Sequence, residues 1–443
     1  MQDGYSAAGR SDVMPKALIE TYGCTLNQAD SDIIESILRQ NGVDVVRGRY
    51  GGGTDYDVVV VNTCTVKKAT EQRIRDRLRG MSHLGKRLVV TGCMASANRD
   101  IIEKTVGNAS IISTNNITKV YEAVKSSIGG KKAVYDAPSR TDKAAYIRQS
   151  GSVIARISIS EGCLSFCNFC ETKFARGPLN SFSEELILKA VEINVRGGAR
   201  EIELASQDTG AYGADRRTDI AELVSRISEV DGKFMVRIGM LNPEHLQRYF
   251  DRLVEAYKRE KVYRFMHLPV QSGSNKVLGE MSRNYRIEEF EGYVSELRRK
   301  IPGITLETDI IVGYPTETDN DFEETFEMVE RVKPTITNIS KFGARPHASA
   351  SRLAQLSGNR INERSRRLAR MVKAMQHEEF GKMKGRVIKV VLTEKNERSL
   401  AGRDEYYHAV AVKDCEAELG SSVYVRIDGN SYACLMGSQF SKG

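Results

Sequence analysis

The chain has 443 residues, of which 40% are hydrophobic and 28% are charged, and its formal net charge is +8 at pH 7. This length exceeds one ordinary domain and predicts about three. The composition excludes a largely disordered protein, and no apolar run reaches the length that a membrane-spanning helix needs. The basic balance permits a polyanionic partner but does not require one.

The first fifteen residues mix Gly, Ser, Asp and Arg without an apolar segment. We therefore expect a flexible tail over residues 1–15, no signal peptide, and a cytoplasmic protein that makes no use of a membrane. Structural disulfides are rare in that compartment, so the eight cysteines favour metal or redox use of thiols.

Residues 16–130 alternate short apolar runs with helical segments, which predicts an amino-terminal doubly wound α/β domain. Three runs, at residues 17–23, 58–63 and 87–92, lead into Cys24, Cys64 and Cys93. Continuous β-branched runs are typical of strands buried on both faces of a parallel sheet. Ligands of open α/β sheets bind beyond the carboxyl ends of such strands.

The three cysteines are therefore predicted to converge, which indicates an iron–sulfur cluster that lacks one protein ligand. Three separate core cysteines are the alternative, because Cys is among the most buried residue types. A helix is expected over residues 30–40, and a second over residues 67–79 carries six Lys and Arg side chains. Such a run is by default a solvated face, with an RNA contact as the alternative. Residues 131–152 are expected to form a linker.

The sharpest pattern in the chain is Cys163, Cys167 and Cys170, with three and two residues between them. Three thiolates on one short loop can hold three corners of a [4Fe-4S] cube and leave one iron open. Half of a structural zinc site is one alternative, but zinc needs four protein ligands, and no further Cys or His lies close by in the sequence. Three buried free cysteines are another. The motif resembles the signature of the radical S-adenosylmethionine (SAM) enzymes, in which the open iron binds SAM.

Residues 153–375 alternate strand-like and helix-like runs, which predicts a parallel sheet. Six strands are expected, at residues 153–159, 201–205, 234–238, 263–268, 305–312 and 336–340. Six such units suggest a central partial (β/α)6 barrel, whose active site is built from the loops that follow the strands. One helix is expected to begin after Ser183 and to end at Gly197.

Polar side chains near those loops are candidates to hold SAM. Donors and acceptors for its carboxylate and ribose are Gln207, Arg237, Gln271 and Ser272. Lys173 and Arg176, just past the third cysteine, are expected to offset the negative charge of a thiolate-bound cluster. A simple polar turn is the alternative for each loop. His267 is a candidate base, although a histidine at a strand end is more often a core residue.

A basic helix is expected over residues 362–383, and the chain then changes in character from residue 380 to residue 443. Runs at residues 386–392, 408–412, 422–427 and 431–436 predict a small antiparallel β-barrel of a kind that often grips RNA. Candidates to contact phosphates and to stack on bases are Lys389, Arg403, Tyr406 and Tyr407. Cys415 and Cys434 have no partner spacing and are expected to be inert.

In the order of its parts, nearly the whole chain resembles the radical SAM methylthiotransferases. TYGCTLNQADS at 21–31, NTC at 62–64 and TGCMA at 91–95 look like the family's amino-terminal domain, whose cysteines carry an auxiliary [4Fe-4S] cluster. Residues 162–177 look like its radical SAM motif. The tail from about residue 381 looks like its TRAM domain, which helps the tRNA-modifying members to bind substrate. The resemblance implies two [4Fe-4S] clusters, one for each set of three cysteines.

Three segments look most like the archaeal and eukaryotic branch of the family: TKFARG at 172–177, QDTGAYG at 207–213 and RIGMLNP at 237–243. That branch converts N6-threonylcarbamoyladenosine at position 37 of tRNA to its 2-methylthio derivative. One SAM would methylate a sulfur at the auxiliary cluster, and a second would be cleaved to a 5'-deoxyadenosyl radical that attacks C2 of the adenine. Asp32, where the family usually has Glu, and residues 347–349, in place of Gly-Thr, depart from the pattern.

The implied partners are tRNA, through its anticodon loop, and an unidentified electron donor, and a monomer is expected. One alternative is the related enzyme that methylthiolates an aspartate of a ribosomal protein. A non-catalytic iron–sulfur protein that binds tRNA, or a two-cluster electron carrier, is an alternative of a different class.

Overall fold

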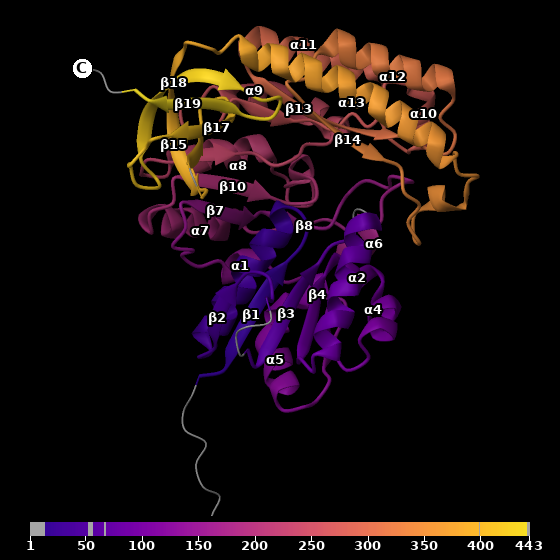
Figure 1. Cartoon of the computed structure of the whole chain (residues 1–443), viewed down its shortest axis with the longest axis vertical. Coiled ribbons are helices and arrows are strands. Elements are labelled where there is room, and N and C mark those ends of the chain that lie inside the picture. Colours follow the sequence, from indigo (N-terminus) through magenta and orange to yellow (C-terminus); the bar gives the residue numbers. More distant parts are fainter. Residues whose placement is uncertain (1–13, 52–55, 66–67, 398, 441–443) are drawn as a thin grey trace, which may run out of the picture. The chain divides into compact units, whose positions relative to one another are not determined.

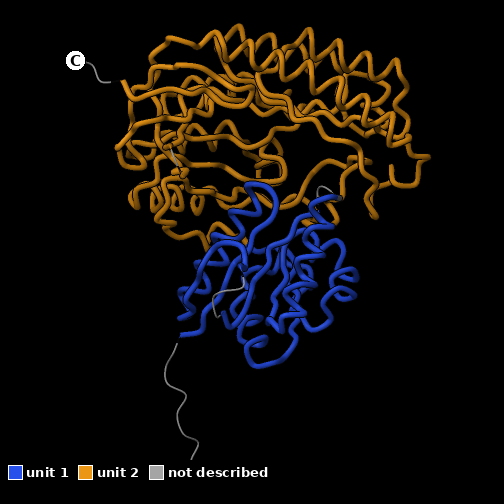
Figure 2. Tube along the Cα trace, viewed as in Figure 1, with its two compact units in different colours: residues 1–65, 69–141 blue, residues 66–68, 142–443 orange. Residues whose placement is uncertain are grey.

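The structure is a computed structural model that describes residues 14–51, 56–65, 68–397 and 399–440. Nearly all of the expected tail at residues 1–15 lies outside these ranges, as does Lys67 of the expected basic helix. The chain forms two compact units, one of residues 1–65 and 69–141 and the other of residues 66–68 and 142–443 (Figure 2). In the described part of the chain, no helix combines the length and the apolar character needed to cross a membrane.

A parallel sheet forms the centre of the amino-terminal unit (Figure 1). Its described strands are β1 (Lys16–Thr21), β2 (Asp44–Arg47), β3 (Val58–Thr63), β4 (Leu88–Gly92), β5 (Ser110–Ile112) and β6 (Val134–Tyr135). They lie in the order β2-β1-β3-β4-β5-β6, which reverses between β1 and β3 as in doubly wound folds. The helices are α1 (Thr25–Gln40), α2 (Lys68–His83), α3 (Cys93–Ala97), α4 (Arg99–Thr105) and α5 (Val120–Ile128).

Helices on both faces of this sheet explain why its strands are apolar along their length. Ile74 and Leu78 of α2 pack on Val59 and Val61 of β3 in one buried core. Helices α1 and α5 pack on each other and on the sheet. Every residue of β3 is buried, as is typical of a strand covered on both sides. The predicted fold class of this part is confirmed.

The sequence analysis does not predict β2, β5 or β6, which have four, three and two residues. Strand β6 lies within residues 131–152, where the sequence analysis expects a linker. Ile111 of β5 pairs with Val134 of β6, so the sheet continues past residue 130.

The central part of the second unit has six parallel strands in chain order, as predicted. They are β7 (Ile154–Ser158), β10 (Glu201–Ala205), β11 (Met235–Arg237), β12 (Phe265–His267), β13 (Thr305–Val312) and β14 (Ile336–Lys341). Strands β7, β10 and β11 form one sheet and β12, β13 and β14 another, and a bridge between Val236 and Val262 joins them. Six successive parallel neighbours make the predicted partial (β/α)6 barrel.

Helices follow these strands and cover one face of the barrel. They are α7 (Glu184–Arg196), α8 (Ile220–Glu229), α9 (Phe250–Tyr257), α10 (Asn275–Glu280), α11 (Ile287–Lys300) and α12 (Asp319–Val332). Ile202, Leu204 and Val236 are fully buried on the covered face. Successive side chains of a strand point to opposite faces of the sheet. The inner face of the barrel therefore carries the side chains of Glu203, Arg237, His267, Glu307 and Asp309. The active-site side of such a barrel is therefore polar.

Helix α13 (Gly358–Gly381) leads into a closed barrel of five described strands, in the order β15-β16-β17-β19-β18. The strands are β15 (Val387–Lys395), β16 (Leu400–Arg403), β17 (Ala409–Lys413), β18 (Ser422–Asn430) and β19 (Leu435–Gln439). The β17–β19 pair is parallel, so the barrel is mixed, whereas a fully antiparallel one is expected from the sequence. An odd number of strands cannot alternate in direction around a closed ring, so one pair must run parallel.

The loop between β16 and β17 packs on the central strands. Tyr407 Oη donates to Oε1 of Glu201 at 3.1 Å and to Oε1 of Glu203 at 3.0 Å, and Tyr263 Oη donates to the other oxygen of Glu201 at 3.1 Å. Arg403 lies over the Tyr407 ring at 4.9 Å. These contacts turn Arg403 and Tyr407 toward the central strands, so the expected role of these two side chains on an RNA surface is not supported.

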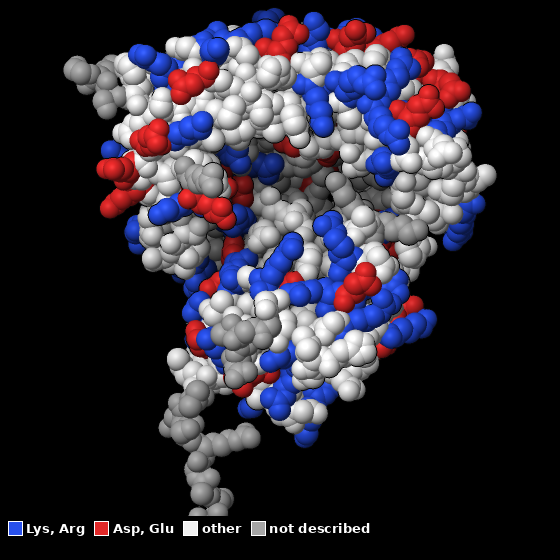
Figure 3. Space-filling model, viewed as in Figure 1, with Lys and Arg blue, Asp and Glu red and all other residues white. Residues whose placement is uncertain are grey.

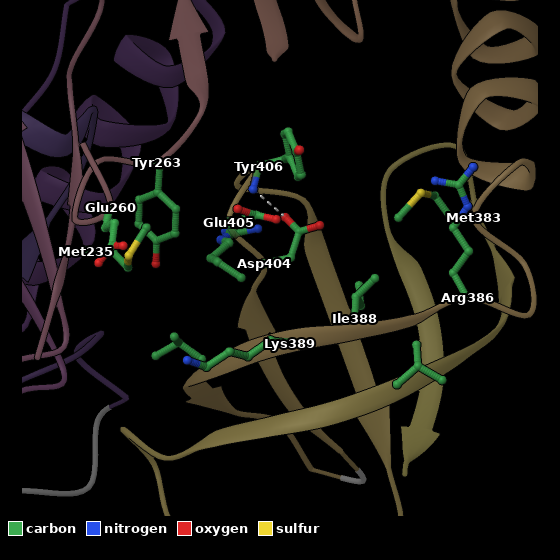
Figure 4. A pocket seen from close by; sticks show the side chains of 13 residues that line it. Met235, Glu260, Tyr263, Met383, Arg386, Ile388, Lys389, Asp404, Glu405 and Tyr406 are labelled. Atoms are coloured by element: carbon green, nitrogen blue, oxygen red, sulfur yellow. Dashed lines mark hydrogen bonds between the residues drawn. The ribbon is translucent and has the colours of Figure 1, made fainter. Parts of the chain in front are cut away.

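A pocket of about 740 Å³ lies where the barrel meets the base of the central strands. Figure 4 shows Asp404, Glu405 and Tyr406 of the loop together, with Tyr263 on the side of the central strands and Lys389 on the side of the barrel. The backbone nitrogen of Tyr406 donates to Asp404 at 3.0 Å, which holds the loop in a tight turn. The barrel is thus attached through polar contacts, with Glu201 at their centre.

We expect Glu201→Gln to change the pH dependence of thermal unfolding. Burial, followed by the charge of Glu203, raises the pKa of Glu201 from 4.5 to about 7. The stability that this protonated carboxyl contributes is present below pH 4.5 and is lost as the pH rises through 7. The free energy of unfolding of the parent falls by about 3 kcal/mol over this range. The Gln side chain of the variant does not ionise, so the variant does not lose this stability.

The difference in melting temperature between the variant and the parent should therefore become more positive from pH 5 to pH 8. Glu330→Gln, at an exposed position of α12, is the matched control and should show no such trend. A difference for Glu201→Gln that stays constant over this range would contradict the assigned pKa.

Candidate active site and cysteine sites

The cysteine loop of the second unit lies between two short strands that pair with each other, β8 (Ser160–Glu161) and β9 (Asn180–Ser181). Gly162 has φ +79°, and a Cβ at this position would collide with the carbonyl of Pro178. The backbone nitrogen of Cys163 donates to the Gly177 carbonyl at 3.2 Å. Glycine at position 162 therefore lets the loop begin in close contact with Gly177 and Pro178, where the chain leaves the loop.

Contacts from a distant segment hold the middle of this loop. Asn168 donates through its backbone nitrogen to the Met281 carbonyl at 3.0 Å and through its side chain to the Glu280 carbonyl at 2.7 Å. Phe169 packs beside Met281 and Tyr314. The end of α10 is thus the scaffold on which the loop is built.

The three thiols of the loop share one partly buried environment. Burial, and then the charge of Asp208, raises the pKa of Cys163 to about 12, and the other two cysteines raise it further. Burial also raises the pKa of Cys167, against the effect of Arg283. Cys170 Sγ accepts a hydrogen bond from the backbone of Thr172 at 3.3 Å. The three thiols thus lie in one part of the fold and affect one another's pKa.

The spacing of the sulfurs bears on the zinc alternative. Among the described residues, neither set of three cysteines brings all three Sγ atoms within 4.8 Å of one another. A single tetrahedral Zn²⁺ would hold its thiolates about 3.8 Å apart. A cluster of several irons binds each thiolate to a different iron, so it accommodates sulfur atoms that lie further apart. The donor sets therefore fit a polynuclear cluster better than one zinc ion.

The loop after β10 has buried polar atoms that the protein leaves unused. Ser206 Oγ and Gln207 Oε1 are buried and have no hydrogen-bond partner among the described residues. Asp208 Oδ1 accepts from the backbone of Gly210 and of Asn242, both at 3.0 Å, and so ties this loop to the one after β11. A buried unpaired acceptor costs free energy unless a ligand satisfies it, which suits Gln207 to a cofactor contact.

Gln271 and Ser272 follow β12 but serve different purposes. Gln271 has φ +70°, and its backbone nitrogen donates to the Asp309 carbonyl at 2.8 Å. Ser272 Oγ is 3.2 Å from Thr325 Oγ1 of α12, which attaches the loop to that helix. The structure thus gives the Ser272 hydroxyl a partner within the protein, while no hydrogen bond engages the Gln271 side chain in the described part of the chain.

Arg237 lies at the end of β11 and not in the loop that follows. Its guanidinium carbon is 5.3 Å from the centre of the Phe265 ring and 5.9 Å from that of Tyr407. Its Nε is buried without a hydrogen-bond partner among the described residues. It thus belongs to the inner face of the barrel, next to Glu203 on the neighbouring strand.

The two cations past the third cysteine lie on α6 (Thr172–Arg176) and have protein partners. Lys173 Nζ donates to the Leu164 carbonyl at 3.2 Å and lies 3.1 Å from the centre of the Phe166 ring. Arg176 pairs with Glu161 at 3.0 Å, and Lys143 pairs with the same carboxylate at 2.7 Å. All three members of this triad are buried, so Arg176 braces the base of the loop.

Arg283 is a contact of the cysteine loop that the sequence does not indicate. Its Nη1 donates to Cys167 Sγ at 3.3 Å, although the two residues are 116 positions apart in the chain. No spacing or motif connects a single arginine after α10 with a cysteine after β8, so only the fold brings them together.

His267 lies on the inner face between two acidic side chains. Its Nε2 is 3.1 Å from Asp309 and its Nδ1 is 3.9 Å from Glu307. One ligand atom of each of these residues lies within 4.8 Å of the others, close enough for a metal ion, although acidic groups often gather without one. The histidine thus has two carboxylate partners on the inner face.

The three cysteines of the amino-terminal unit follow three adjacent strands. Cys24 precedes α1, Cys64 follows β3, and Cys93 is the first residue of α3 after β4. Asn27 Oδ1 lies 3.9 Å from Cys24 Sγ and 3.7 Å from Cys93 Sγ. A Cβ at Gly23 would come 3.0 Å from the Cβ of Cys64. The structure thus brings all three cysteines to one edge of the sheet, around Asn27.

Asn27 also fixes the strand ends that carry these cysteines. Its Nδ2 donates to the Tyr22 carbonyl at 2.8 Å and to the Thr63 carbonyl at 2.9 Å. Gly92 has φ +90°, and a Cβ there would collide with the Thr63 carbonyl, so only glycine lets β4 end this close to β3. In the sequence, Asn27 lies before the helix expected over residues 30–40, whereas in the structure α1 begins at Thr25 and includes it.

Two residues that depart from the family pattern also have partners. Asp32 pairs with Arg47 on the amino-terminal unit. His347 stacks on Phe174 of α6, with ring centres 5.1 Å apart. The His347 ring therefore covers Phe174, four residues past the third cysteine.

Comparison with known proteins agrees with this division of the chain. Residues 16–113 match the model of the Uncharacterized protein family UPF0004, and residues 157–329 match the Radical SAM superfamily. The solved structure of the radical SAM methyltransferase TsrM from Kitasatospora setae, at 13% identity, superposes with a TM-score of 0.56 over 76% of this chain and 75% of that one. This last likeness concerns the fold alone.

Two relatives align along nearly the whole chain. A probable threonylcarbamoyladenosine tRNA methylthiotransferase from Archaeoglobus fulgidus is 39% identical over 95% of this chain and 98% of its own length. The threonylcarbamoyladenosine tRNA methylthiotransferase of Drosophila melanogaster is 32% identical over 95% of this chain and 77% of its own length. At this level of identity, and with both cysteine sites in the matched regions, the chain belongs to the radical SAM methylthiotransferase family.

Proposed function

We propose that this enzyme converts N6-threonylcarbamoyladenosine at position 37 of tRNA to its 2-methylthio derivative. The observation that carries the proposal is the similarity, over at least 86% of this chain and at least 77% of each relative, to proteins that are named for this substrate. The two separate sets of three cysteines support it, because a methylthio transfer needs both a radical and a place to hold sulfur. Single-stranded bases such as those of an anticodon loop can be splayed into a pocket.

As a radical SAM enzyme, the protein uses a [4Fe-4S] cluster and SAM. When bound, this pair supplies a carbon radical by one-electron cleavage of the SAM sulfonium. We propose Cys163, Cys167 and Cys170 as the ligands of the cluster. Their loop leaves one position open, since each contributes one thiolate and no fourth cysteine belongs to it. The hydrogen bonds of the loop to α10 hold the thiolates in place before the cofactor arrives.

For SAM we propose contacts from the loops after β10 and β12. Gln207 and Gln271 have side chains that are not committed to the protein, so they remain the strongest candidates. Ser272 would support this site by attaching its loop to α12. Arg237 would act from the inner face, and Lys173 and Arg176 would act on the cysteine loop itself, by closing and bracing it.

For the amino-terminal unit we propose a second [4Fe-4S] cluster on Cys24, Cys64 and Cys93. The convergence of these residues around Asn27 and the match to the UPF0004 model support it. Thiolates are the soft ligands that such a site needs. The Asn27 amide would orient the ends of β1 and β3, so that their cysteines face the same edge.

For the tRNA we propose a basic stripe on α13, which we define as Arg366, Arg370 and Lys373. The two arginines are exposed, one helical turn apart, and line a groove of about 570 Å³. Lys373 Nζ lies 4.8 Å from the ring centre of Tyr432, which is 47% exposed on the carboxyl-terminal barrel. Figure 3 shows Lys and Arg side chains gathered over α12 and α13, among acidic ones. Cations beside an exposed aromatic ring suit a nucleic-acid backbone and base.

The electron donor, the monomeric state and the cytoplasmic location stay predictions. The alternative of a protein-modifying enzyme has less support, because the names of these relatives give tRNA as the substrate. A non-catalytic scaffold would need neither set of thiols in a shared environment. These alternatives differ from the proposal in what each cysteine site must do, which substitutions can test.

We expect the reconstituted protein, incubated without oxygen with SAM, reductant, sulfide and tRNA that carries N6-threonylcarbamoyladenosine, to form the 2-methylthio nucleoside. Nucleoside mass spectrometry would detect it. Cleavage of SAM without any change in the nucleoside would contradict the proposed substrate and would make a protein substrate the leading alternative.

Substitutions should separate the two cysteine sites. Cys64→Ala should keep SAM cleavage but lose sulfur insertion, because it removes a ligand from the amino-terminal site alone. Cys167→Ala should lose SAM cleavage and keep tRNA binding. Cys434→Ala is a control in which both activities should persist, since its thiol donates to the Leu435 carbonyl and belongs to neither set of three cysteines. Sulfur insertion that survives in Cys64→Ala would refute the second cluster, and cellular function that survives in Cys167→Ala would favour the scaffold.

We expect the double variant Arg366→Ala, Arg370→Ala to bind tRNA more weakly and with less dependence on salt. Each lost phosphate contact lowers the slope of log K against log[salt] by about 0.7 to 0.9, so the slope should fall by about 1.5. Filter binding at several salt concentrations measures it. Arg196→Ala with Arg299→Ala removes two exposed arginines that pair with neighbouring glutamates, and its slope should match the parent. Equal slopes in both double variants would exclude the stripe.

A further inference from the structure

The guanidinium of Arg283 is held in one orientation against the cysteine loop. Besides the contact with Cys167, its Nε donates to Tyr285 Oη at 3.2 Å and its Nη2 donates to the Pro269 carbonyl at 3.2 Å. Only 9% of the residue is exposed. All three nitrogens therefore have a partner, and the one that faces the loop is aimed at a sulfur.

Arg283 forms no ion pair with a carboxylate within the described ranges. This distinguishes it from Arg176, whose charge is paired with Glu161 beneath the same loop. Arginine does not lose its proton in proteins, so the charge persists at every working pH. In a buried site that charge is weakly screened and acts strongly on a neighbour a few ångströms away.

A positive charge and an N–H donor at a thiolate affect the two redox states of a cluster unequally. The reduced state carries one more negative charge, so it gains more from both. Hydrogen bonds to the sulfurs, net charge and solvent exposure are the factors by which proteins set the potential of an iron–sulfur cluster. Arg283 contributes to the first two, because it donates to a sulfur and adds a positive charge.

We infer that Arg283 raises the reduction potential of the cluster on Cys163, Cys167 and Cys170, so that the electron donor can deliver its electron more readily. The inference rests on the proposed function, which places a cluster there. Arg283 is a positioning and tuning residue, since it acts through Cys167. Its bond to the Pro269 carbonyl also connects the cysteine loop to the loop of Gln271, two residues further on.

The test is a redox titration of the full chain, reconstituted without oxygen and followed by electron paramagnetic resonance. The background carries Cys24→Ala, Cys64→Ala and Cys93→Ala, so that only one cluster contributes to the signal. We expect Arg283→Gln to lower the equilibrium constant for one-electron reduction about tenfold, which corresponds to about 59 mV. Arg283→Lys keeps the charge but not the fork of donors, so its potential should lie between those of Arg283→Gln and the background protein.

Arg286→Gln is the matched control, because Arg286 pairs with Glu288 at 3.2 Å and its side chain is 68% exposed. Its potential should equal that of the background protein. Iron and sulfide contents are measured first, and Arg283→Lys supplies the comparison if Arg283→Gln does not load. Unchanged potentials in loaded Arg283 variants, or an equal shift in the control, would overturn the inference alone. A background protein that binds no cluster would overturn the proposed function as well.

Discussion

The cysteine loop needs a rigid support, and the rest of the active site depends on this constraint. Three thiolates hold a cluster in a defined place only if the backbone between them is fixed, and this loop is too short to fix itself. The Gly177 carbonyl holds its start, and the Met281 and Glu280 carbonyls hold its middle. The same segment after α10 supplies Arg283, so support and electrostatic tuning come from one place.

The amino-terminal unit reaches a similar arrangement by a different route. Its cysteines are far apart in the chain and meet because β1, β3 and β4 are adjacent and parallel. Parallel strands end at one edge, so residues that follow them converge without any local motif. Asn27 and Gly92 then adjust the strand ends at close range. Spacing along the chain brings the cysteines of the second unit together, whereas the order of the strands in the sheet brings those of the amino-terminal unit together.

The carboxyl-terminal barrel shows where sequence reasoning about single residues fails. Arg403 and Tyr407 are a cation and an aromatic on a barrel of a kind that grips RNA, and yet they pack on the central strands. Composition cannot distinguish an exposed aromatic from one that faces a neighbouring part of the fold. The sequence also predicts a basic helix over residues 362–383, to which it assigns no RNA contact, and there the structure leaves Arg366 and Arg370 exposed.

The sequence by itself determined the two cysteine sets, three strands of the amino-terminal sheet and the six central strands, and the three-part order of the chain. These features are local or periodic, so they can be read along the chain. Only the tertiary structure decided the partners of the side chains. Arg176 is committed to Glu161, Ser272 to Thr325, and Cys167 to Arg283 at a separation of 116 residues. Such pairs form because the fold brings distant segments into contact, and no spacing in the sequence records that.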